Sequence, residues 1–215
     1  MIMTFNFNHS NLVYQYKFHI SKMEGIKNIY PSLNNYLVTL NKMCPNDYFS
    51  SGPRSSALRF KLNLDIKSIQ GHELSQLTKH ALKLDGIKSA HLKVQTFLIE
   101  KDNKSVATEV PIWITKDELV NYKELFKSEL PLTGHIDLLR IEDNTVWVWD
   151  YKPYAKNEKY AATQVYFYSL MLSKRTGIPL SNFMGGYFDK DNAYIFKPRE
   201  DIASNTNLSN FLTDV

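Results

Sequence analysis

The chain has 215 residues, 43% of them hydrophobic and 22% charged, and its 26 basic and 22 acidic residues give a net charge of +4. This composition indicates one soluble globular domain, and the slight positive charge is compatible with a nucleic-acid partner. No apolar run approaches the length of about 18 residues that a membrane helix needs, and no signal peptide pattern is present, so we expect a cytoplasmic protein without a membrane partner. The single cysteine, Cys44, excludes an intramolecular disulfide and an iron–sulfur cluster held by cysteines alone.

The N-terminal part of the chain, residues 1–56, is expected to cover one side of a core formed by the residues that follow. A helix is predicted over residues 32–43, ending before Pro45. The loop at residues 50–56 contains Arg54, which either contacts a phosphate or belongs to a solvated connector.

Residues 57–198 are expected to contain the core of the domain. Apolar residues at helical spacing predict a helix over residues 68–84, with Gly86 as its stop, and a shorter helix over residues 118–128. Alternating apolar residues predict strands over residues 91–100 and 106–114. Glu109, in the second of these strands, is interpreted as a surface carboxylate.

A hairpin follows, with strands over residues 133–139 and 146–152 joined by a polar turn. Strand alternation places Asp137 on the face of its strand opposite to Ile136 and Leu138. In the second strand, Asp150 and Lys152 share a face with Val146 and Val148. An unpaired buried charge costs several kcal/mol or shifts its pKa, so these charged groups need a partner. A divalent cation is the best candidate.

The remaining pattern predicts a helix over residues 158–176 with Gly177 at its end, and strands over residues 183–188 and 193–196. The polar tail at residues 199–215 is expected to be disordered. No repeat or linker divides the chain, so one α/β domain is the simplest organisation.

Two carboxylates on neighbouring strands suit Mg²⁺ or Mn²⁺, which bind oxygen ligands and accept phosphate oxygens as well. Such a cation lowers the pKa of a bound water and neutralises charge on a phosphate. Lys152 could orient the attacking water or stabilise the transition state. The residues therefore indicate phosphodiester hydrolysis.

Three motifs in this order resemble those of the PD-(D/E)XK nuclease superfamily, and within it the RecB-like exonuclease branch. Gly-His-Ile-Asp at 134–137 is similar to that branch's G-x-x-D motif, Asp-Tyr-Lys at 150–152 to D-x-K, and Gln-Val-Tyr-Phe-Tyr at 164–168 to Q-x-x-x-Y. The resemblance implies a restriction-endonuclease-like fold with an αβββαβ core, in which helices flank a mixed central sheet.

The resemblance also implies a ligand set for the metal. Asp137 and Asp150 would be ligands, and the backbone carbonyl of Tyr151 would be a further one. Glu109, before Val110, also resembles a strand position of this branch, with the surface carboxylate as the favoured interpretation. A histidine early on an upstream helix joins the metal site in this family; His72 is the first choice for it, and His80 is the alternative.

Further roles are implied beside the metal. Lys152 would be the catalytic lysine, and Gln164 and Tyr168 would support the ligands or contact DNA. Lys156 lies close enough in sequence to hold the substrate backbone, with a solvated loop charge as the alternative. His135, inside the first motif, is a candidate for substrate contact.

The expected function is that of a Mg²⁺- or Mn²⁺-dependent deoxyribonuclease, resembling RecB-like exonucleases of DNA repair, recombination or replication. A structure-specific or site-specific endonuclease and a non-catalytic DNA-binding module in a larger complex are the alternatives. The expected partner is DNA, as single strands or duplex ends. No P-loop motif is present, so any ATP-driven unwinding would come from a helicase or repair complex.

Overall fold

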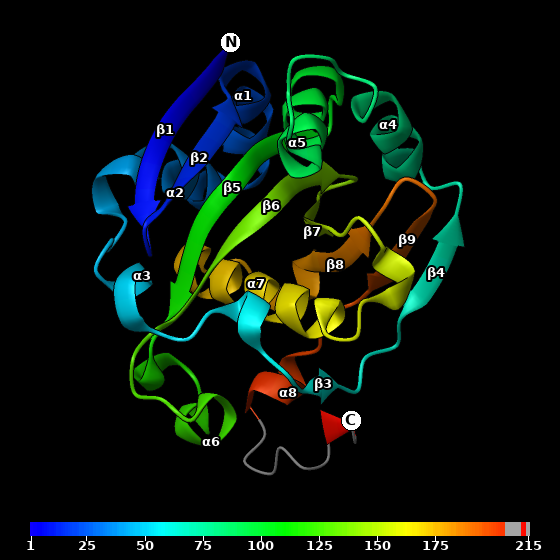
Figure 1. The fold of residues 1–215 in the computed structure, drawn as a ribbon. Helices are drawn as coiled ribbons and strands as arrows, with labels where there is room; N and C mark the ends of the chain where they lie inside the picture. The colour runs from blue at the N-terminus through cyan, green and yellow to red at the C-terminus, as the bar shows by residue number, and fades with distance from the viewer. Residues whose placement is uncertain (205–211, 214–215) are drawn as a thin grey trace.

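The computed structural model describes residues 1–204 and 212–213, and its main feature is an eight-stranded sheet with helices on both faces (Figure 1). The sheet has the order β1-β2-β5-β6-β7-β8-β9-β4, and its strand pairs are antiparallel except for the parallel pair β7–β8. The strands of this sheet are β1 (Ile2–His9), β2 (Leu12–His19), β4 (Lys67–Gln70), β5 (Ser105–Ile114), β6 (Leu132–Glu142), β7 (Thr145–Tyr151), β8 (Phe183–Phe188) and β9 (Asn192–Phe196). This is the mixed α/β architecture that the motifs led us to expect.

The helices fall into long ones that cover the sheet and short ones in connections. The α-helices are α1 (Ile20–Ile29), α2 (Pro31–Met43), α3 (Tyr48–Ser51), α4 (Glu73–Ala81), α5 (Ala90–Lys101), α6 (Tyr122–Phe126), α7 (Ala161–Thr176) and α8 (Glu200–Ser204). Four 3-10 turns, η1 (Ser55–Ala57), η2 (Lys116–Glu118), η3 (Ala155–Asn157) and η4 (Leu180–Asn182), and a two-stranded sheet of β3 (Lys61–Leu62) and β10 (Leu212–Thr213) complete the described elements.

Two hydrophobic clusters lie on opposite faces of the central strands. Leu138 and Trp149 pack with residues of α4 and α5, whereas Leu139 and Val148 belong to the larger cluster that includes α2 and α7. The period-2 alternation of β6 and β7 therefore divides their side chains between two helical layers. Figure 1 shows α4 and α5 together at one end of the molecule and α7 crossing the sheet, where it contacts β5, β6, β7 and β8.

The strand predicted over residues 91–100 is wrong, because this segment belongs to helix α5. Ser89 caps the helix by accepting a hydrogen bond from the Leu92 backbone, and Val94 and Leu98, four residues apart, are both buried. These are the signals of a helix N-terminus and of a helical apolar face. The helix predicted over residues 68–84 is also too long, since residues 67–70 pair with β9 and the helix begins only at Glu73.

The other sequence-based elements lie close to their predicted positions, with two further differences. The helix predicted over residues 118–128 is split into η2 and α6, with Asn121 in a left-handed conformation between them at a φ of 60°. In the predicted polar tail, residues 200–204 form α8, and residues 205–211 and 214–215 lie outside the described residues.

The N-terminal segment covers the core and also contributes two strands to the central sheet. Helices α1 and α2 pack against it, but β1 and β2 form a hairpin that extends the sheet beyond β5. The two turn residues, Ser10 and Asn11, both have positive φ angles, as a tight two-residue hairpin requires. The domain boundaries at residues 56 and 198 stay a prediction. None of the helices in the described part of the chain has the length and apolar content needed to cross a membrane.

Candidate active site

The hairpin β6–β7 brings Asp137 and Asp150 together in the centre of the sheet. Leu138 pairs with Trp149, so the two aspartates occupy the next opposed positions, and the Tyr151 backbone N–H donates to Asp137 Oδ2 at 2.9 Å. Both residues are nearly inaccessible to solvent, with 8% of Asp137 and 1% of Asp150 exposed. Burial and the neighbouring Asp137 carboxylate raise the pKa of Asp150 to about 7.

Lys152 and Gln164 supply the polar partners of Asp150. Lys152 Nζ lies 2.7 Å from Asp150 Oδ2, and the Gln164 amide nitrogen donates to Asp150 Oδ1 at 2.9 Å. Lys152 also donates to Gln164 Oε1 at 3.1 Å. Burial acts to lower the pKa of Lys152, but the Asp150 carboxylate outweighs it and raises that pKa, so the ammonium stays charged.

The first and third motifs meet through Gly134 and Tyr168. A Cβ atom on Gly134 would lie 2.3 Å from Cε1 of the buried Tyr168 ring, so only glycine lets this ring lie against β6. The Tyr168 hydroxyl accepts a hydrogen bond from Gln164 Nε2 at 2.8 Å. The glycine thus positions Tyr168, Tyr168 positions Gln164, and Gln164 orients both Asp150 and Lys152.

His91 is the histidine that reaches the carboxylates. It lies at the start of α5, and its Nε2 is 2.7 Å from Asp137 Oδ2. Burial acts to lower the pKa of His91, but the Asp137 carboxylate outweighs it and raises that pKa to about 9, so the ring is protonated at neutral pH. The sequence analysis missed His91 because it placed residues 91–100 in a strand; the capping residue Ser89 was the available signal.

The structure places His72 elsewhere, against the prediction. His72 caps α4, with its Nδ1 accepting from the Leu74 backbone at 3.1 Å, and its ring lies 5.1 Å from that of Trp149. Burial and the nearby Arg140 lower its pKa. The alternative, His80, is exposed on the surface of α4. Of these three histidines, His91 is the one that contacts a carboxylate of the site.

Glu109 adds a third carboxylate, and the prediction of a surface residue was wrong. It lies in β5 between Thr108 and Val110, whose partners in β6 flank Asp137. Glu109 is partly buried, its Oε1 accepts a hydrogen bond from Gln95 of α5 at 2.7 Å, and its φ is 51°. Burial and the Asp137 carboxylate raise its pKa to about 7.

Three other candidates lie outside this cluster of carboxylates. Lys156 is exposed in η3, on the loop that follows β7. Arg54 lies over the ring of Tyr14, with its guanidinium 5.3 Å from the ring centroid. His135 is buried and stacks on Tyr14, so burial and the neighbouring His9 lower its pKa well below the ordinary value, which leaves the ring neutral. His135 is therefore enclosed by protein side chains.

The donor atoms of the cluster fit a hard divalent cation. Asp150 Oδ2 is buried and accepts no hydrogen bond of good geometry, although Lys152 lies beside it. The mutual repulsion of Asp137, Asp150 and Glu109 is what a cation would relieve. Among the residues that the structure describes, no three His, Cys, Asp or Glu side chains stand in a ready-made metal-binding arrangement. The chemistry of the site thus fits the metal, with Asp137 and Asp150 turned in part toward their protein partners.

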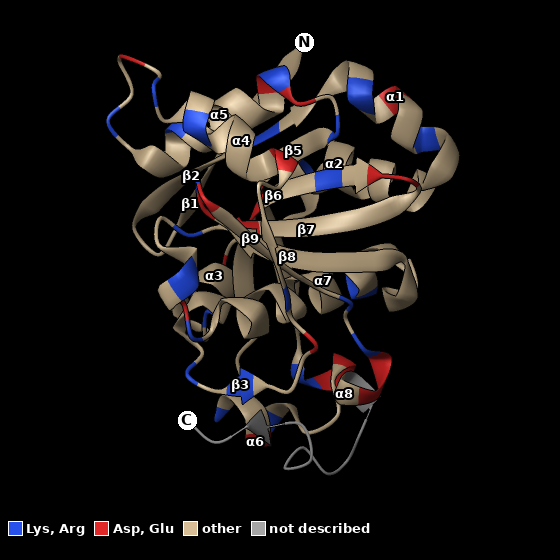
Figure 2. Cartoon of the chain, turned by 90° about the vertical axis from the view of Figure 1, so that its right-hand side faces the viewer, with Lys and Arg blue, Asp and Glu red and all other residues tan. Residues whose placement is uncertain are grey.

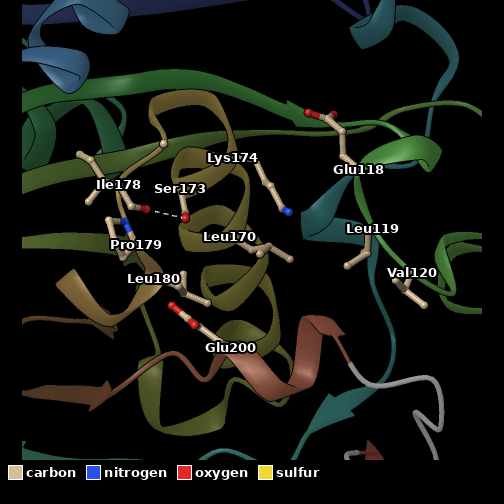
Figure 3. Close-up of a pocket in the computed structure, with 11 residues that line it drawn as sticks. Glu118, Leu119, Val120, Leu170, Ser173, Lys174, Ile178, Pro179, Leu180 and Glu200 are labelled. Atoms are coloured by element: carbon tan, nitrogen blue, oxygen red, sulfur yellow. Dashed lines mark hydrogen bonds between the residues drawn. The ribbon is translucent and has the colours of Figure 1, made fainter.

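A separate cavity lies apart from the carboxylate cluster, since no residue of that cluster lines it. This cavity of about 470 Å³ at the C-terminal end of α7 is lined mainly by apolar residues with Glu118, Lys174 and Glu200 at its edges, and Ser173 donates there to the Ile178 carbonyl at 2.6 Å (Figure 3). Lys and Arg residues are dispersed over α1, α5 and β3 in the view of Figure 2. The buried carboxylate cluster is therefore the candidate site.

Comparison with known proteins agrees with the geometry. Residues 64–209, more than half of the chain, match the PD-(D/E)XK nuclease superfamily, and this span contains all three motifs. No curated protein matches the chain. With the carboxylates of β6 and β7, the lysine that follows them and the α/β sheet in place, the chain belongs to the PD-(D/E)XK nuclease superfamily.

Proposed function

We propose that the protein is a Mg²⁺- or Mn²⁺-dependent deoxyribonuclease that resembles RecB-like exonucleases and acts on DNA in repair, recombination or replication. The observation that carries this proposal is the convergence of Asp137, Asp150 and Lys152, held by Gln164, at one buried point of the sheet. A DNA-binding module would have no need of two buried carboxylates with a lysine beside one of them, because such buried charges are costly to a fold. Cytoplasmic location and a helicase or repair complex as partner stay predictions.

The carboxylates of the site would bind the divalent cation. Asp137 and Asp150 would hold the cation, together with the Tyr151 carbonyl implied by the family and with Glu109 close by. The cation, when bound, would lower the pKa of a water and neutralise charge on the phosphate.

The lysine supplies a positive charge beside the reacting phosphate. Lys152 remains protonated because of Asp150, so it can donate hydrogen bonds to the water or to a phosphate oxygen where negative charge develops. Gln164 fixes the direction of the ammonium by accepting one of its hydrogen bonds. His91, protonated through its contact with Asp137, holds that carboxylate in place.

The test is cleavage of end-labelled linear DNA and of covalently closed circles, single- and double-stranded, with Mg²⁺, Mn²⁺ or EDTA. Asp150→Asn and Lys152→Met should abolish cleavage, whereas the matched variants Asp47→Asn and Lys42→Met, at exposed positions, should retain it. Loss of linear DNA alone supports an exonuclease, and cutting of circles supports an endonuclease. Metal-independent binding without cleavage by the unaltered protein would refute the enzymatic proposal.

A further inference from the structure

The loop between β7 and α7 begins directly after Lys152 and carries an exposed aromatic side chain. Among the Phe, Tyr and Trp residues that the structure describes, Tyr154 is the most exposed, at 75%, and Tyr48 follows at 36%. Single exposed apolar residues are common on protein surfaces. What distinguishes Tyr154 is its place beside the candidate site and the way in which its backbone is held.

Tyr154 lies at the border of the carboxylate cluster. Two residues of extended chain span at most about 7 Å, so its backbone lies within that distance of the Lys152 backbone. Burial raises the pKa of Tyr151, and the Asp189 carboxylate and the Tyr154 hydroxyl raise it further, so both groups lie near the Tyr151 hydroxyl. The Tyr151 ring in turn meets the His91 imidazole edge to face, with the ring centroids 5.0 Å apart. The exposed ring is therefore a neighbour of the residues that surround the carboxylates.

Hydrogen bonds hold the backbone around Tyr154 in a defined shape. The Ala155 N–H donates to Oδ2 of the buried Asp189 at 2.9 Å, and Asp189 Oδ1 accepts two backbone N–H groups of the turn between β8 and β9, each at 2.7 Å. The Tyr154 carbonyl accepts from the Asn157 N–H at 2.9 Å, which closes the turn of η3. Because the backbone is fixed before a ligand arrives, a contact to the ring costs little ordering of the loop.

Basic side chains follow the exposed ring along the loop. Residues 152–160 contain three lysines and one glutamate. Lys156 and Lys159 are exposed, and the Arg59 guanidinium lies over the ring of Tyr160 at the end of the loop, 5.7 Å from the ring centroid. Aromatic rings that stack on bases and positive charges that pair with phosphates are the combination by which proteins bind a nucleic acid strand.

We propose that the Tyr154 ring stacks on a base of the nucleotide next to the scissile phosphodiester, with Lys156 beside an adjoining phosphate. The inference rests on the proposed nuclease function. It adds a substrate contact outside the three motifs, on the loop that joins the second motif to the third.

The test measures kcat/KM for cleavage of an end-labelled DNA oligonucleotide with Mg²⁺. Tyr154→Ala should lower this value about tenfold, the scale of one lost base–aromatic contact, whereas Tyr154→Phe and Tyr154→Trp, which keep an aromatic face, should stay within about twofold. The melting temperature of Tyr154→Ala should match that of the unaltered protein, because the side chain it removes is exposed.

Tyr48→Ala is the matched control for the loss of an exposed ring. Tyr48 lies near Arg175 in the last turn of α7, about 22 Å along that helix from Tyr160, so its removal should leave kcat/KM unchanged. Full activity of Tyr154→Ala, or an equal loss in Tyr48→Ala, overturns the inference.

A series of abasic sites separates base stacking from other effects of the substitution. A single abasic site is moved through the oligonucleotide around the cleaved bond. In the unaltered protein one position should lower kcat/KM about tenfold, and the same position should lower that of Tyr154→Ala by less than about twofold, because the contact is already missing. Independent losses at every position overturn the base contact and leave the nuclease proposal intact. An unaltered protein that cleaves no DNA with Mg²⁺ or Mn²⁺ overturns the proposed function, and the inference with it.

Discussion

His91 and His72 give the sharpest test of the site, because sequence reasoning favoured His72 and the structure brings His91 to Asp137. We expect His91→Asn to weaken cleavage, since the shorter amide cannot reach the carboxylate that the imidazole contacts at 2.7 Å. His72→Asn should have no comparable effect. Asparagine is itself a preferred N-cap residue, so this change keeps the cap of α4 while removing the imidazole.

The magnitude follows from the electrostatics of His91. Burial opposes its charge, but Asp137 outweighs burial and raises the pKa from 6.5 to about 9, which corresponds to roughly 3 kcal/mol at about 1.36 kcal/mol per pKa unit. The side chain is 39% exposed, so solvent screening reduces this to about 1–2 kcal/mol. If Asp137 loses that much positional stabilisation in the transition state, cleavage falls about 5- to 30-fold.

The assay is the initial rate of cleavage of a labelled linear substrate at saturating Mg²⁺, with thermal unfolding of each variant measured in parallel. His80→Asn, at an exposed position of the helix that His72 caps, serves as the control. A His91→Asn enzyme as active as the unaltered protein, with His72→Asn impaired, would refute the assignment of the contact to His91.

Three further substitutions test a close packing contact and a network of ion pairs. Gly134→Ala should place a methyl group against the Tyr168 ring and lower the free energy of unfolding by about 1–3 kcal/mol. The cleavage rate should fall as well, and an unchanged melting temperature would contradict this expectation. Arg140→Met should cost about 3–5 kcal/mol in urea unfolding because it leaves Asp102 buried and unpaired, and Asp102→Asn in the same chain should recover part of the loss. Glu73→Gln should lower stability at pH 7 by about 1 kcal/mol, after allowance for the 48% exposure of its side chain. Hydrogen bonds from Lys104 and Arg140 lower the pKa of Glu73 to about 2, so its contribution is present above the unfolded-state pKa and is lost as the pH falls toward 2. A stability difference between Glu73→Gln and the unaltered protein that persisted undiminished at pH 2 would contradict that origin.

The local patterns that predicted the hairpin succeeded because a hairpin is determined by neighbouring residues. Val146 and Val148 alternate with the tryptophans, and the polar turn before them has Asp143 and Asn144 at positive φ. Register then follows from the turn, and register alone sets Asp137 opposite Asp150. Lys152 could be expected at the site for the same reason, because it follows Asp150 closely in the same segment. Gln164, on α7, was expected only from the resemblance of residues 164–168 to the Q-x-x-x-Y motif.

Helix α5 shows where local pattern was insufficient. In residues 91–100 the apolar positions fit an alternating strand as well as a helix, and the choice depends on packing against β5 and α4. The N-terminal hairpin was also missed, although its pattern was available in the sequence. Aromatic residues alternate in both strands, on either side of the two turn residues, at Phe5, Phe7, Tyr14, Tyr16 and Phe18.

By itself, the sequence determined the hairpin that brings Asp137, Asp150 and Lys152 together, because strand alternation and turn geometry act between adjacent segments. The αβββαβ core was expected from the resemblance of the three motifs to a known family. Only the tertiary structure decided that His91 and Glu109 join the two aspartates and that His72 does not. Those contacts link α5 and β5 to β6 across the sheet, so they depend on how a helix is placed over strands distant in sequence.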